Sequence, residues 1–527
     1  MNVRHLTPQV LPVLGALFVV LHLANGAAAQ HDYKPSSQLI FAGKFDKAVE
    51  VLQDKLKKQA DDCEWHYQLA IAQAQRGEYD SAEAALKEAL RLGVAPGRAA
   101  ADAHYLLAPL RQRPYFQKLL ASQRYLPTQG PMVGHMTDTA ASIWLRTAEP
   151  AEVRVVVTPA DGSKPDSPQT ASAQTSADSD YTAVVRVGGL QPGRRYRYTL
   201  EIDGRAVTLD QETEFCTAPT PGSPLQFSLA FGGGAGYVTE HEHMWDTIRN
   251  EKPDLLLMLG DNMYSDAPKS TPTQRYCYYR RQSPPPFRNL VSRTAVYSIW
   301  DDHDFGDNDC EGGPEIDKPA WKRPVWEVFR QNWANPGYGQ GEQRPGCWYD
   351  FQVGDVQFFM LDGRYYRHLK GGTMLGPQQK QWLKERLRAS QATFKVICSP
   401  VPFEYRTKGD SRDTWNGYRD ERTEIFDCLT DHKITGVILM SADRHRSDAW
   451  KVERPGDYAL YEFNSSRLTN HHKHPEMKEA IFSYNRTPSF GLVEFDTTKA
   501  DPTVRYTVIN IKGERKHTLE LKLSQLK

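Results

Sequence analysis

The sequence predicts a multidomain protein in which a small all-α region and a small β-sandwich precede a layered α/β domain. Three observations lead to this prediction. The chain has 527 residues, more than one ordinary core accommodates, so roughly two to four domains are expected. A helical repeat near the N-terminus is followed by alternating β-type sequence, and then by strands that alternate with helices. We place these regions at residues 36–125, 126–220 and 221–527, after a signal peptide at 1–29.

The composition excludes some classes of protein. The 65 basic and 65 acidic residues give a formal net charge of zero, so no basic surplus indicates a nucleic-acid partner. Charged residues at 25% and aromatic residues at 11% are typical of folded globular domains. The seven cysteines include no C-x-x-C pair, which argues against a structural zinc site. Cys277, Cys310 and Cys347 lie in loop-rich sequence, where an oxidising compartment would permit disulfides.

The first 29 residues have the order of a secretory signal peptide. Arg4 and His5 precede an apolar run from Leu11 to Leu23, and small residues from Gly26 to Ala29 follow. A membrane anchor is the alternative, but the run is shorter than the ~20 residues that a spanning helix needs. We therefore expect cleavage, export to the periplasm or the extracellular space, and no stable membrane span afterwards.

A repeat with a period of 34 residues lies in the first region. Five positions recur in order: Gly43, Phe45, Asp46, Ala48 and Leu52 return as Gly77, Tyr79, Asp80, Ala82 and Leu86. The pattern resembles the tetratricopeptide repeat, in which small residues let paired helices approach one another. A plain helical hairpin is the alternative. Because two repeats are few, we expect these helices to pack on the next domain or on a protein partner.

The second region alternates as β-strands do. Strands are predicted at residues 141–146, 151–157, 181–187 and 196–200. The segment L-Q-P-G-R-R-Y from Leu190 to Tyr196 is similar to the L-x-P-x-x-x-Y signature of fibronectin type III domains. We therefore predict a small fibronectin III-like β-sandwich without chemistry of its own.

The third region alternates between strands and helices. Strands are predicted at residues 226–231, 254–259, 356–361, 394–399 and 436–441, and a helix at 378–390. This alternation predicts an α/β layered domain. In open α/β sheets, functional groups gather in loops just past the carboxyl ends of the strands.

Three loops at predicted strand ends are rich in metal-binding residue types. They are G-D-N-M-Y-S-D from Gly260 to Asp266, W-D-D-H-D-F-G-D-N-D from Trp300 to Asp309, and S-A-D-R-H-R from Ser441 to Arg446. So many carboxylates repel one another unless cations neutralise them. Oxygen ligands suit Ca²⁺, Mg²⁺, Mn²⁺ or Fe³⁺, and histidine adds a borderline ligand. Two metals bridged by one carboxylate would support phosphoryl transfer.

Further motifs lie between the second and third loops and after the third, in a specific order. They are F-M-L-D-G-R-Y-Y-R at 359–367, M-L-G-P-Q-Q-K-Q-W-L at 374–383, D-T-W-N-G-Y-R-D-E-R at 413–422 and F-G-L-V-E-F at 490–495. Together with L-G-D-N-M-Y, W-D-D-H-D-F-G-D-N and S-A-D-R-H-R, they resemble the PhoD-type alkaline phosphatases, a branch of the calcineurin-like metallophosphoesterases. The resemblance runs over about residues 227–494. A fibronectin-like sandwich in front is similar to the family's own arrangement.

The resemblance implies a metal centre with assigned ligands. Asp261 would bridge the metals, Tyr264 would bind ferric iron, and Asn308 would bind a second metal, often calcium in this family. Asp443 and His445 would complete the shell or hold the phosphate. The predicted catalytic residues are Asp261, His303, Asn308, Asp443, Arg444 and His445, and the predicted metal ligands are Asp261, Tyr264, Asn308, Asp443 and His445.

Basic residues near the motifs have alternative roles. The arginines that could bind phosphate through paired N–H donors are Arg364, Arg419, Arg444 and Arg446. Of these we select Arg444, although any of them could instead pair with the surplus carboxylates. His303 is predicted as a general acid or a supporting group, with a structural role as the alternative. The run N-H-H-K-H from Asn470 to His474 looks like a metal tract, but we predict a surface loop there.

One departure concerns the iron. The family usually has a cysteine ligand in a segment resembling F-A-S-C at the end of the first strand. Here F-G-G-G-A-G-Y runs from Phe231 to Tyr237, and Gly234 occupies roughly the place of the cysteine. We therefore expect two or more metal ions, Ca²⁺ and possible Fe³⁺, with Mn²⁺ or another divalent ion as the alternative. Water or phosphate could fill the gap, backbone N–H groups could approach an anion, or the glycines could form a close-packed turn.

The function predicted from the sequence is hydrolysis of phosphate esters by metal-bound hydroxide outside the cytoplasm. The predicted partner is a phosphate-ester substrate, and a protein could bind the helical repeats. No activated serine stands beside a base, so no covalent intermediate is expected. The alternative is a catalytically degenerate PhoD-like binding or scaffold protein that acts through its helical repeats. The absent cysteine favours this alternative, whereas the retained acidic residues oppose it.

Overall fold

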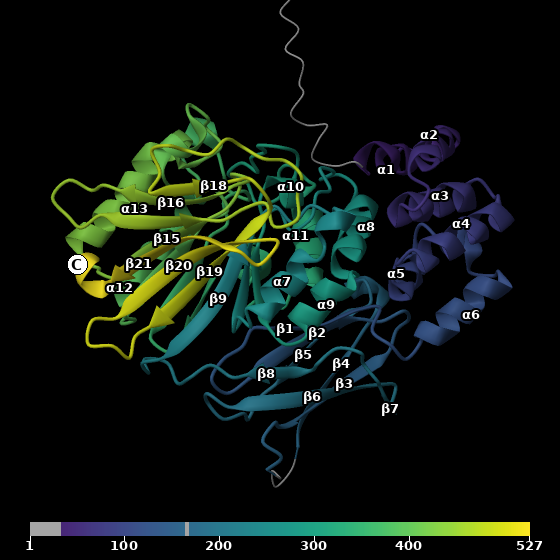
Figure 1. Cartoon of the computed structure of the whole chain (residues 1–527), viewed down its shortest axis with the longest axis horizontal. Helices are drawn as coiled ribbons and strands as arrows, with labels where there is room; N and C mark the ends of the chain where they lie inside the picture. Colours follow the sequence, from purple (N-terminus) through teal and green to yellow (C-terminus); the bar gives the residue numbers. More distant parts are fainter. Residues whose placement is uncertain (1–32, 164–167) are drawn as a thin grey trace, which may run out of the picture.

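The computed structural model describes residues 33–163 and 168–527. The predicted signal peptide at residues 1–29 lies outside these residues. Within the two described ranges, no helix is both long enough and apolar enough to cross a membrane. Figure 1 shows the N-terminal helices at one side of the molecule, beside the α/β domain and above the strands of the second region.

The N-terminal region is a row of short helices. They are α1 (Lys34–Phe41), α2 (Phe45–Lys58), α3 (Cys63–Gln75), α4 (Tyr79–Arg91), α5 (Pro96–Ala101) and α6 (Pro114–Gln123). The repeated glycines Gly43 and Gly77 follow α1 and α3 with φ angles of 68° and 81°, the left-handed conformation that glycine adopts past helix ends. The repeated alanines Ala48 and Ala82 are fully buried. The sequence repeat thus marks helix ends and helix contacts, while its relation to the tetratricopeptide repeat stays a prediction.

The second region consists of strands. They are β1 (Gln129–Gly134), β2 (Ala141–Arg146), β3 (Glu152–Pro159), β4 (Gln169–Gln174), β5 (Thr182–Val187), β6 (Arg195–Ile202), β7 (Arg205–Ala206) and β8 (Glu214–Cys216). The strands β3 and β6 alternate between exposed and buried residues, as expected for a sheet with one face in water.

The α/β domain follows. Its strands are β9 (Gln226–Gly232), β10 (Leu255–Leu259), β11 (Ala295–Ile299), β12 (Tyr349–Val353), β13 (Val356–Met360), β14 (Phe394–Cys398), β15 (Val437–Ser441), β16 (Ser447–Val452), β17 (Leu460–Asn464), β18 (Phe482–Tyr484), β19 (Ser489–Asp496), β20 (Thr503–Asn510) and β21 (Arg515–Lys522). Its helices are α7 (Met244–Asn250), α8 (Thr271–Gln282), α9 (Pro285–Val291), α10 (Asp302–Phe305), α11 (Lys322–Asn332), α12 (Gly376–Ala389) and α13 (Arg419–Asp431).

The largest sheet crosses the predicted boundary between the second region and the α/β domain. Its nine strands have the order β21-β20-β19-β9-β10-β11-β1-β2-β5. The joint is a parallel pairing of β1 with β11, in which Gly134 lies opposite Val296. The other described strands of the second region form a separate sheet; they are β3, β4, β6, β7 and β8. The second region therefore shares its core with the α/β domain, and its fibronectin III-like character stays a prediction.

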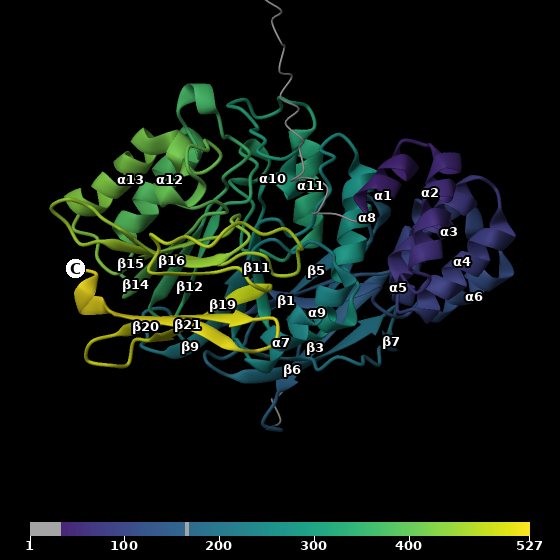
Figure 2. The same cartoon turned by 45° about the horizontal axis from the view of Figure 1, so that its top comes forward.

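A second large sheet packs against the first. Its seven strands have the order β12-β13-β14-β15-β17-β16-β18, and α12 and α13 cover its outer face (Figure 2). Aromatic rings fill the space between the sheets: Tyr297 of β11 stacks on Phe351 of β12 with ring centroids 3.8 Å apart, and Phe227 of β9 contacts Phe358 of β13. The parallel strands β10, β13, β14 and β15 are buried along their whole length, which explains their continuous apolar runs.

Helix α8 joins the three regions through buried charges. Glu64 of α3 accepts a hydrogen bond from Arg98 at 2.5 Å and lies 3.6 Å from Arg280 of α8. On the same helix, the Tyr279 hydroxyl donates to Asp180 of the second region at 2.6 Å. The side chains of Glu64 and Asp180 are both fully buried. The helical region therefore packs on the α/β domain, which was not expected from the sequence. It also packs on the next region, as expected, where the Tyr105 hydroxyl donates to Asp180 at 3.0 Å.

The disulfides considered from the sequence are not formed. All seven cysteines, which lie within the described ranges, are unpaired. Cys277 lies inside α8 rather than in a loop, and Cys347 is fully buried. Burial raises the pKa of Cys277 to about 11, so this thiol stays protonated near neutral pH.

We expect Glu64→Gln to lower the free energy of unfolding by about 3–5 kcal/mol, because the change leaves buried Arg98 and Arg280 without their counter-charge. Urea unfolding of the whole chain, followed by tryptophan fluorescence, measures the effect. The matched control is Asp54→Asn, which removes an exposed ion pair with Lys57 and should not shift the unfolding midpoint. Equal midpoints for Glu64→Gln and the wild type would contradict the role given to α8.

Candidate metal centre

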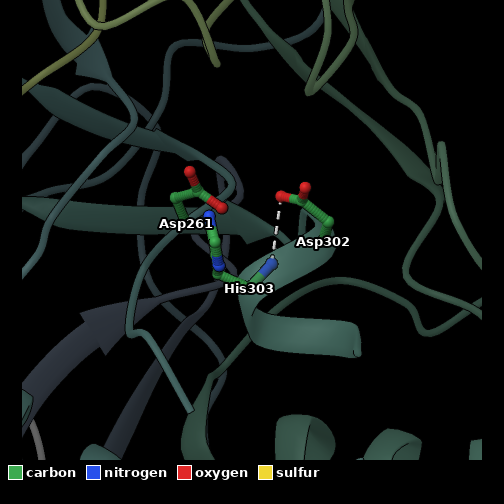
Figure 3. Close-up of side chains that lie close together, drawn as sticks. All are labelled: Asp261, Asp302 and His303. Carbon is green, nitrogen blue, oxygen red and sulfur yellow. Dashed lines mark hydrogen bonds between the residues drawn. The ribbon is translucent and has the colours of Figure 1, made fainter. Parts of the chain in front are cut away.

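Loops at the carboxyl ends of β10 and β11 bring acidic side chains together. Potential ligand atoms of Asp261, Asp302 and His303 lie within 4.8 Å of one another, and all three residues are buried. Figure 3 shows the Asp261 and His303 side chains next to one another, with the Asp302 carboxylate accepting from the His303 backbone N–H at 3.0 Å. A second group, formed by Asp302, Asp309 and Asp413, meets the same distance limit. Asp302 is common to both groups.

Asp304 determines how the two loops fold. Its carboxylate accepts hydrogen bonds from the backbone N–H groups of Asn262 at 3.2 Å, Met263 at 3.0 Å and Asp301 at 3.0 Å. Asp301 in turn caps the N-terminus of α10, so that Asp301 and Asp304 form a capping box. Asp304 therefore ties the loop after β11 to the loop after β10 and fixes the acidic side chains that lie between them.

The backbone is strained at three of the predicted site residues. Asp261, Asp443 and His445 have φ angles of 52°, 65° and 47°, in the left-handed region that residues other than glycine seldom adopt. Such conformations persist only where the surroundings enforce them, and they cluster at functional sites. Before Asp261, Gly260 has a φ of 96°, and a Cβ there would lie 2.6 Å from the Cβ of Asp301. The first two loops thus meet at a position that only glycine can occupy.

The electrostatics of the centre favour bound cations. Burial raises the pKa of Asp261 well above its usual value, and the carboxylates of Asp302 and Asp301 raise it further, whereas His303 lowers it. Asp261 Oδ1 and Asp301 Oδ2 are buried and accept no hydrogen bond from the described residues. A buried carboxylate oxygen without a partner is costly unless a cation neutralises it. The donor set at this place therefore fits metal ions.

Arg364 compensates part of the negative charge. Its guanidinium donates to Asp301 at 2.5 Å and to Asp413 at 2.6 Å, and its side chain is fully buried. Asp413 also pairs with Arg367 at 2.5 Å. Although burial alone would raise it, these arginines hold the pKa of Asp413 well below its usual value. Arg364 therefore positions carboxylates. Pairing with the surplus carboxylates was the alternative role predicted for the arginines from the sequence.

Tyr264 and Asn308 occupy different surroundings. The Tyr264 hydroxyl donates to Asp261 Oδ2 at 3.1 Å, and its ring lies 4.5 Å from that of His303. The structure thus places this predicted ligand inside the acidic centre. Asn308 is exposed, whereas the backbone N–H of its neighbour Asp309 donates to Asp302 at 2.7 Å. The metal-binding role of Asn308 stays a prediction.

The loop after β15 contributes the remaining predicted residues. Asp443 Oδ2 lies 3.3 Å from Arg444 and 3.9 Å from Lys408. Burial would raise the pKa of Asp443, but Lys408 and Arg444 hold it below its usual value. Burial lowers the pKa of His445 well below its usual value. Lys408 also pairs with Asp413 at 3.0 Å and so connects this loop to the acidic groups.

His303 is linked to the N-terminal helices. Its Nδ1 bonds to Asp266 Oδ1 at 2.5 Å, and Asp266 Oδ2 accepts from Lys34 Nζ at 2.7 Å. Burial disfavours a charged imidazole, but the carboxylates of Asp302 and Asp261 raise the pKa of His303 well above its usual value. Lys34, the first residue of α1, is therefore linked to the candidate metal centre through the carboxylate of Asp266.

Several residues in or beside the acidic centre were not selected from the sequence. Asp266, Asp302, Asp309 and Asp413 stand inside the quoted motifs, and their acidity was the available signal. Lys34 and Lys408 lie outside every motif and carried no signal, because only the tertiary structure brings them to the centre.

We expect Asp261→Asn to reduce the stabilisation that Mn²⁺ gives to the fold, because Asp261 belongs to one of the two groups of potential ligands. A carboxyl group whose pKa rises on folding destabilises the protein at pH values above its unfolded pKa, so with chelator near neutral pH the variant should melt at or above the wild-type temperature. Saturating Mn²⁺ should raise the wild-type melting temperature by about 5 °C or more and raise that of the variant clearly less. Differential scanning calorimetry measures both effects.

The control for this experiment is Asp307→Asn, which changes an exposed residue of the loop after β11 and should respond to Mn²⁺ as the wild type does. An equal Mn²⁺ response in Asp261→Asn and the wild type would show that Asp261 holds no cation.

Comparisons with known proteins identify the family of the chain. A family model described as PhoD-like phosphatase matches residues 229–519, and a domain of unknown function, DUF7800, matches residues 127–220. Alkaline phosphatase D of Bacillus subtilis is 24% identical over 323 residues, which are 50% of this chain and 53% of that protein. Purple acid phosphatase 15 of Arabidopsis thaliana is 24% identical over 220 residues, or 38% of this chain and 37% of that protein. The chain thus spans about half the length of the first relative and less of the second.

Solved structures show the same fold. A structure of PhoD has a TM-score of 0.61 at 17% identity and covers 75% of this chain and 90% of that chain. Purple acid phosphatase PPD1 from yellow lupin (Lupinus luteus) has a TM-score of 0.55 at 12% identity and covers 75% of each chain. The predicted metallophosphoesterase fold, with mixed sheets and helices, is therefore confirmed. The family model matches more than half of the residues of this chain. The chain therefore belongs to the PhoD-like phosphatase family.

Proposed function

We propose that this protein is a metal-dependent phosphoesterase that hydrolyses phosphate esters. The observation that carries the proposal is the position of Asp302, which belongs to both groups of potential metal ligands. A carboxylate shared by two groups of ligands is the arrangement that holds two cations side by side for phosphoryl transfer. Membership of the PhoD-like phosphatase family supports the same chemistry.

The two groups differ in the metals that they suit. Asp302, Asp309 and Asp413 offer only carboxylate oxygens, which are the ligands of Ca²⁺. Around Asp261, the phenol of Tyr264 adds a hard oxygen donor suited to Fe³⁺ or Mn²⁺. When bound, such ions would polarise the phosphoryl oxygens and lower the pKa of water.

The chain's own cations would orient the phosphate group. Lys408 keeps 19% of its side chain exposed while it contacts Asp309, Asp413 and Asp443. A cation at the solvent edge of an acidic centre can attract an anionic ester that the carboxylates would otherwise repel. Arg444 lies beside Asp443 and is the second candidate for this role.

His303 would carry a proton rather than bind a metal ion. Asp266 accepts from His303 Nδ1, because an ionised carboxylate has no proton to donate. This bond fixes the orientation of the ring and keeps a proton on Nδ1. The ring is thus positioned to support proton transfer to the leaving oxygen of the ester.

The proposal includes export to the periplasm or the extracellular space. Its support is the order of residue types in the first 29 residues of the sequence. A phosphoesterase in that location would release phosphate from esters outside the cytoplasm.

The test is hydrolysis of chromogenic phosphate mono- and diesters by the metal-depleted chain, with and without added Ca²⁺ and Mn²⁺. We expect turnover that depends on metal and falls by about 100-fold or more in Asp261→Asn, since even residues that only support a metal ligand are worth about 10–100-fold. The ratio of the two substrates identifies the preferred ester.

Asp307→Asn serves again as the matched control and should retain wild-type turnover. Turnover of the wild type no higher than that of Asp261→Asn, with each metal tried, would refute the phosphoesterase and favour a binding role for a degenerate family member.

A further inference from the structure

A cavity lies between the second region and the α/β domain, with a volume of about 270 Å³. Phe215 of β8 and Arg195 of β6 line it from the second region, and Leu255 and Thr294 line it from the starts of β10 and β11. We call it the amino-end cavity. At a rise of ~3.3 Å per residue, β10 separates Leu255 from Asp261 by about 20 Å. The amino-end cavity is therefore distinct from the acidic centre at the other end of the same strands.

The interior of the amino-end cavity is apolar. Its walls include the buried rings of Phe215, Phe227 and Tyr297 and the buried side chain of Leu255. The hydroxyl of Tyr297 is already used, because it donates to the carbonyl of Met136 at 3.1 Å. Of the described buried side-chain polar atoms that lack a hydrogen-bond partner, none belongs to the lining of this cavity. Such an interior suits the hydrocarbon part of a ligand.

The mouth of the cavity carries more positive than negative charge. Four basic and two acidic side chains line the cavity, and all six residues are at least partly exposed. They are Arg195, Arg249, Lys252, Arg293, Glu214 and Asp254.

Most of these charges have partners. Ion pairs join Arg249 to Asp246, Arg293 to Glu212 and Glu214 to Arg197. Asp254 accepts a hydrogen bond from the backbone N–H of Ser228 at 2.9 Å. Arg195 and Lys252 differ from the other basic residues, because neither has a described carboxylate oxygen within 4.0 Å. Two cations without a close counter-charge thus stand beside an apolar interior.

We propose that the amino-end cavity binds a small amphipathic anion, with a short hydrocarbon body and one carboxylate group. The hydrocarbon would lie against Phe215, Phe227 and Tyr297, and the carboxylate would lie at the mouth, where Arg195 and Lys252 supply charged N–H donors. Sites for drug-sized ligands have volumes of about 300–1,000 Å³, so a cavity at the lower limit of this range takes a body shorter than the acyl chain of a membrane lipid.

The test is isothermal titration calorimetry of the full chain with butanoate, hexanoate and octanoate. We expect the affinity to rise by about three- to fourfold for each added CH₂ group, as hydrocarbon leaves water. Octan-1-ol should bind about 10-fold more weakly than octanoate, because it offers no charge to the two cations. Octan-1-ol that binds as tightly as octanoate would overturn the assignment of an anion.

The variants Arg195→Gln and Lys252→Gln test the two cations. Both side chains are exposed, and each change should weaken octanoate binding by about three- to tenfold while octan-1-ol binding stays the same. The matched controls are Arg205→Gln in the neighbouring strand β7 and Lys433→Gln. Lys433 is an exposed lysine with a φ of 51°, against 53° at Lys252. Both controls should bind octanoate as the wild type does.

Cys216 reports where the ligand binds. It lines the cavity and is partly exposed, as is Cys63 in the helical region. Saturating octanoate should slow alkylation of Cys216 by iodoacetamide and leave the rate at Cys63 unchanged, as measured by mass spectrometry of the peptides. No heat of octanoate binding, wild-type affinity in both charge variants, or an unchanged rate at Cys216 would overturn the inference. Because no metal or phosphate ester is present, these results are independent of the proposed phosphoesterase.

Discussion

Concentrated negative charge at the carboxyl ends of two sheets' strands is the constraint on which the rest of the structure depends. Asp261, Asp301 and Asp304 are all nearly inaccessible to solvent, and each buried carboxylate would cost several kcal/mol without compensation. The compensation differs from residue to residue. Asp304 accepts backbone hydrogen bonds, and Asp301 shares Arg364 with Asp413. Asp261 Oδ1 and Asp301 Oδ2 accept no hydrogen bond from the described residues, so their negative charge is not compensated by the protein. The fold itself thus leaves a place for cations.

The same constraint explains why the helical region is closely attached to the α/β domain. Lys34 contributes a positive charge to Asp266, which holds His303. This arrangement works only if α1 keeps a fixed position, and the buried pairing of Glu64 with Arg98 and α8 secures that position. A loosely tethered repeat module would not place a lysine within hydrogen-bond distance of a carboxylate behind the metal centre. The helices therefore form part of the frame that holds the acidic centre.

The sequence was informative where the cause of structure is local. The buried strands β9, β10, β13, β14 and β15 lie within about one residue of their predicted bounds, because continuous apolar runs leave few alternatives. The loops around Asp261 and Asp443 were predicted because acidic residues after strands have a recognisable chemistry. The pairing of β1 with β11 depends on residues far apart in the chain, and no local pattern predicted that the second region continues the main sheet. For the same reason, Lys34 and Lys408 could not be selected from the sequence.

The glycine turn after β9 decides between the two accounts of the absent cysteine. A degenerate centre should have a gap at the place of the cysteine, and neutral side chains where the carboxylates now stand. Instead, the backbone of Arg467 fills the space beside Gly234. The acidic residues remain buried and under strain, with Asp261 in a left-handed conformation. A fold without cations would be relieved by neutral side chains at these positions, so the buried carboxylates argue against the degenerate alternative and for a site that suits cations.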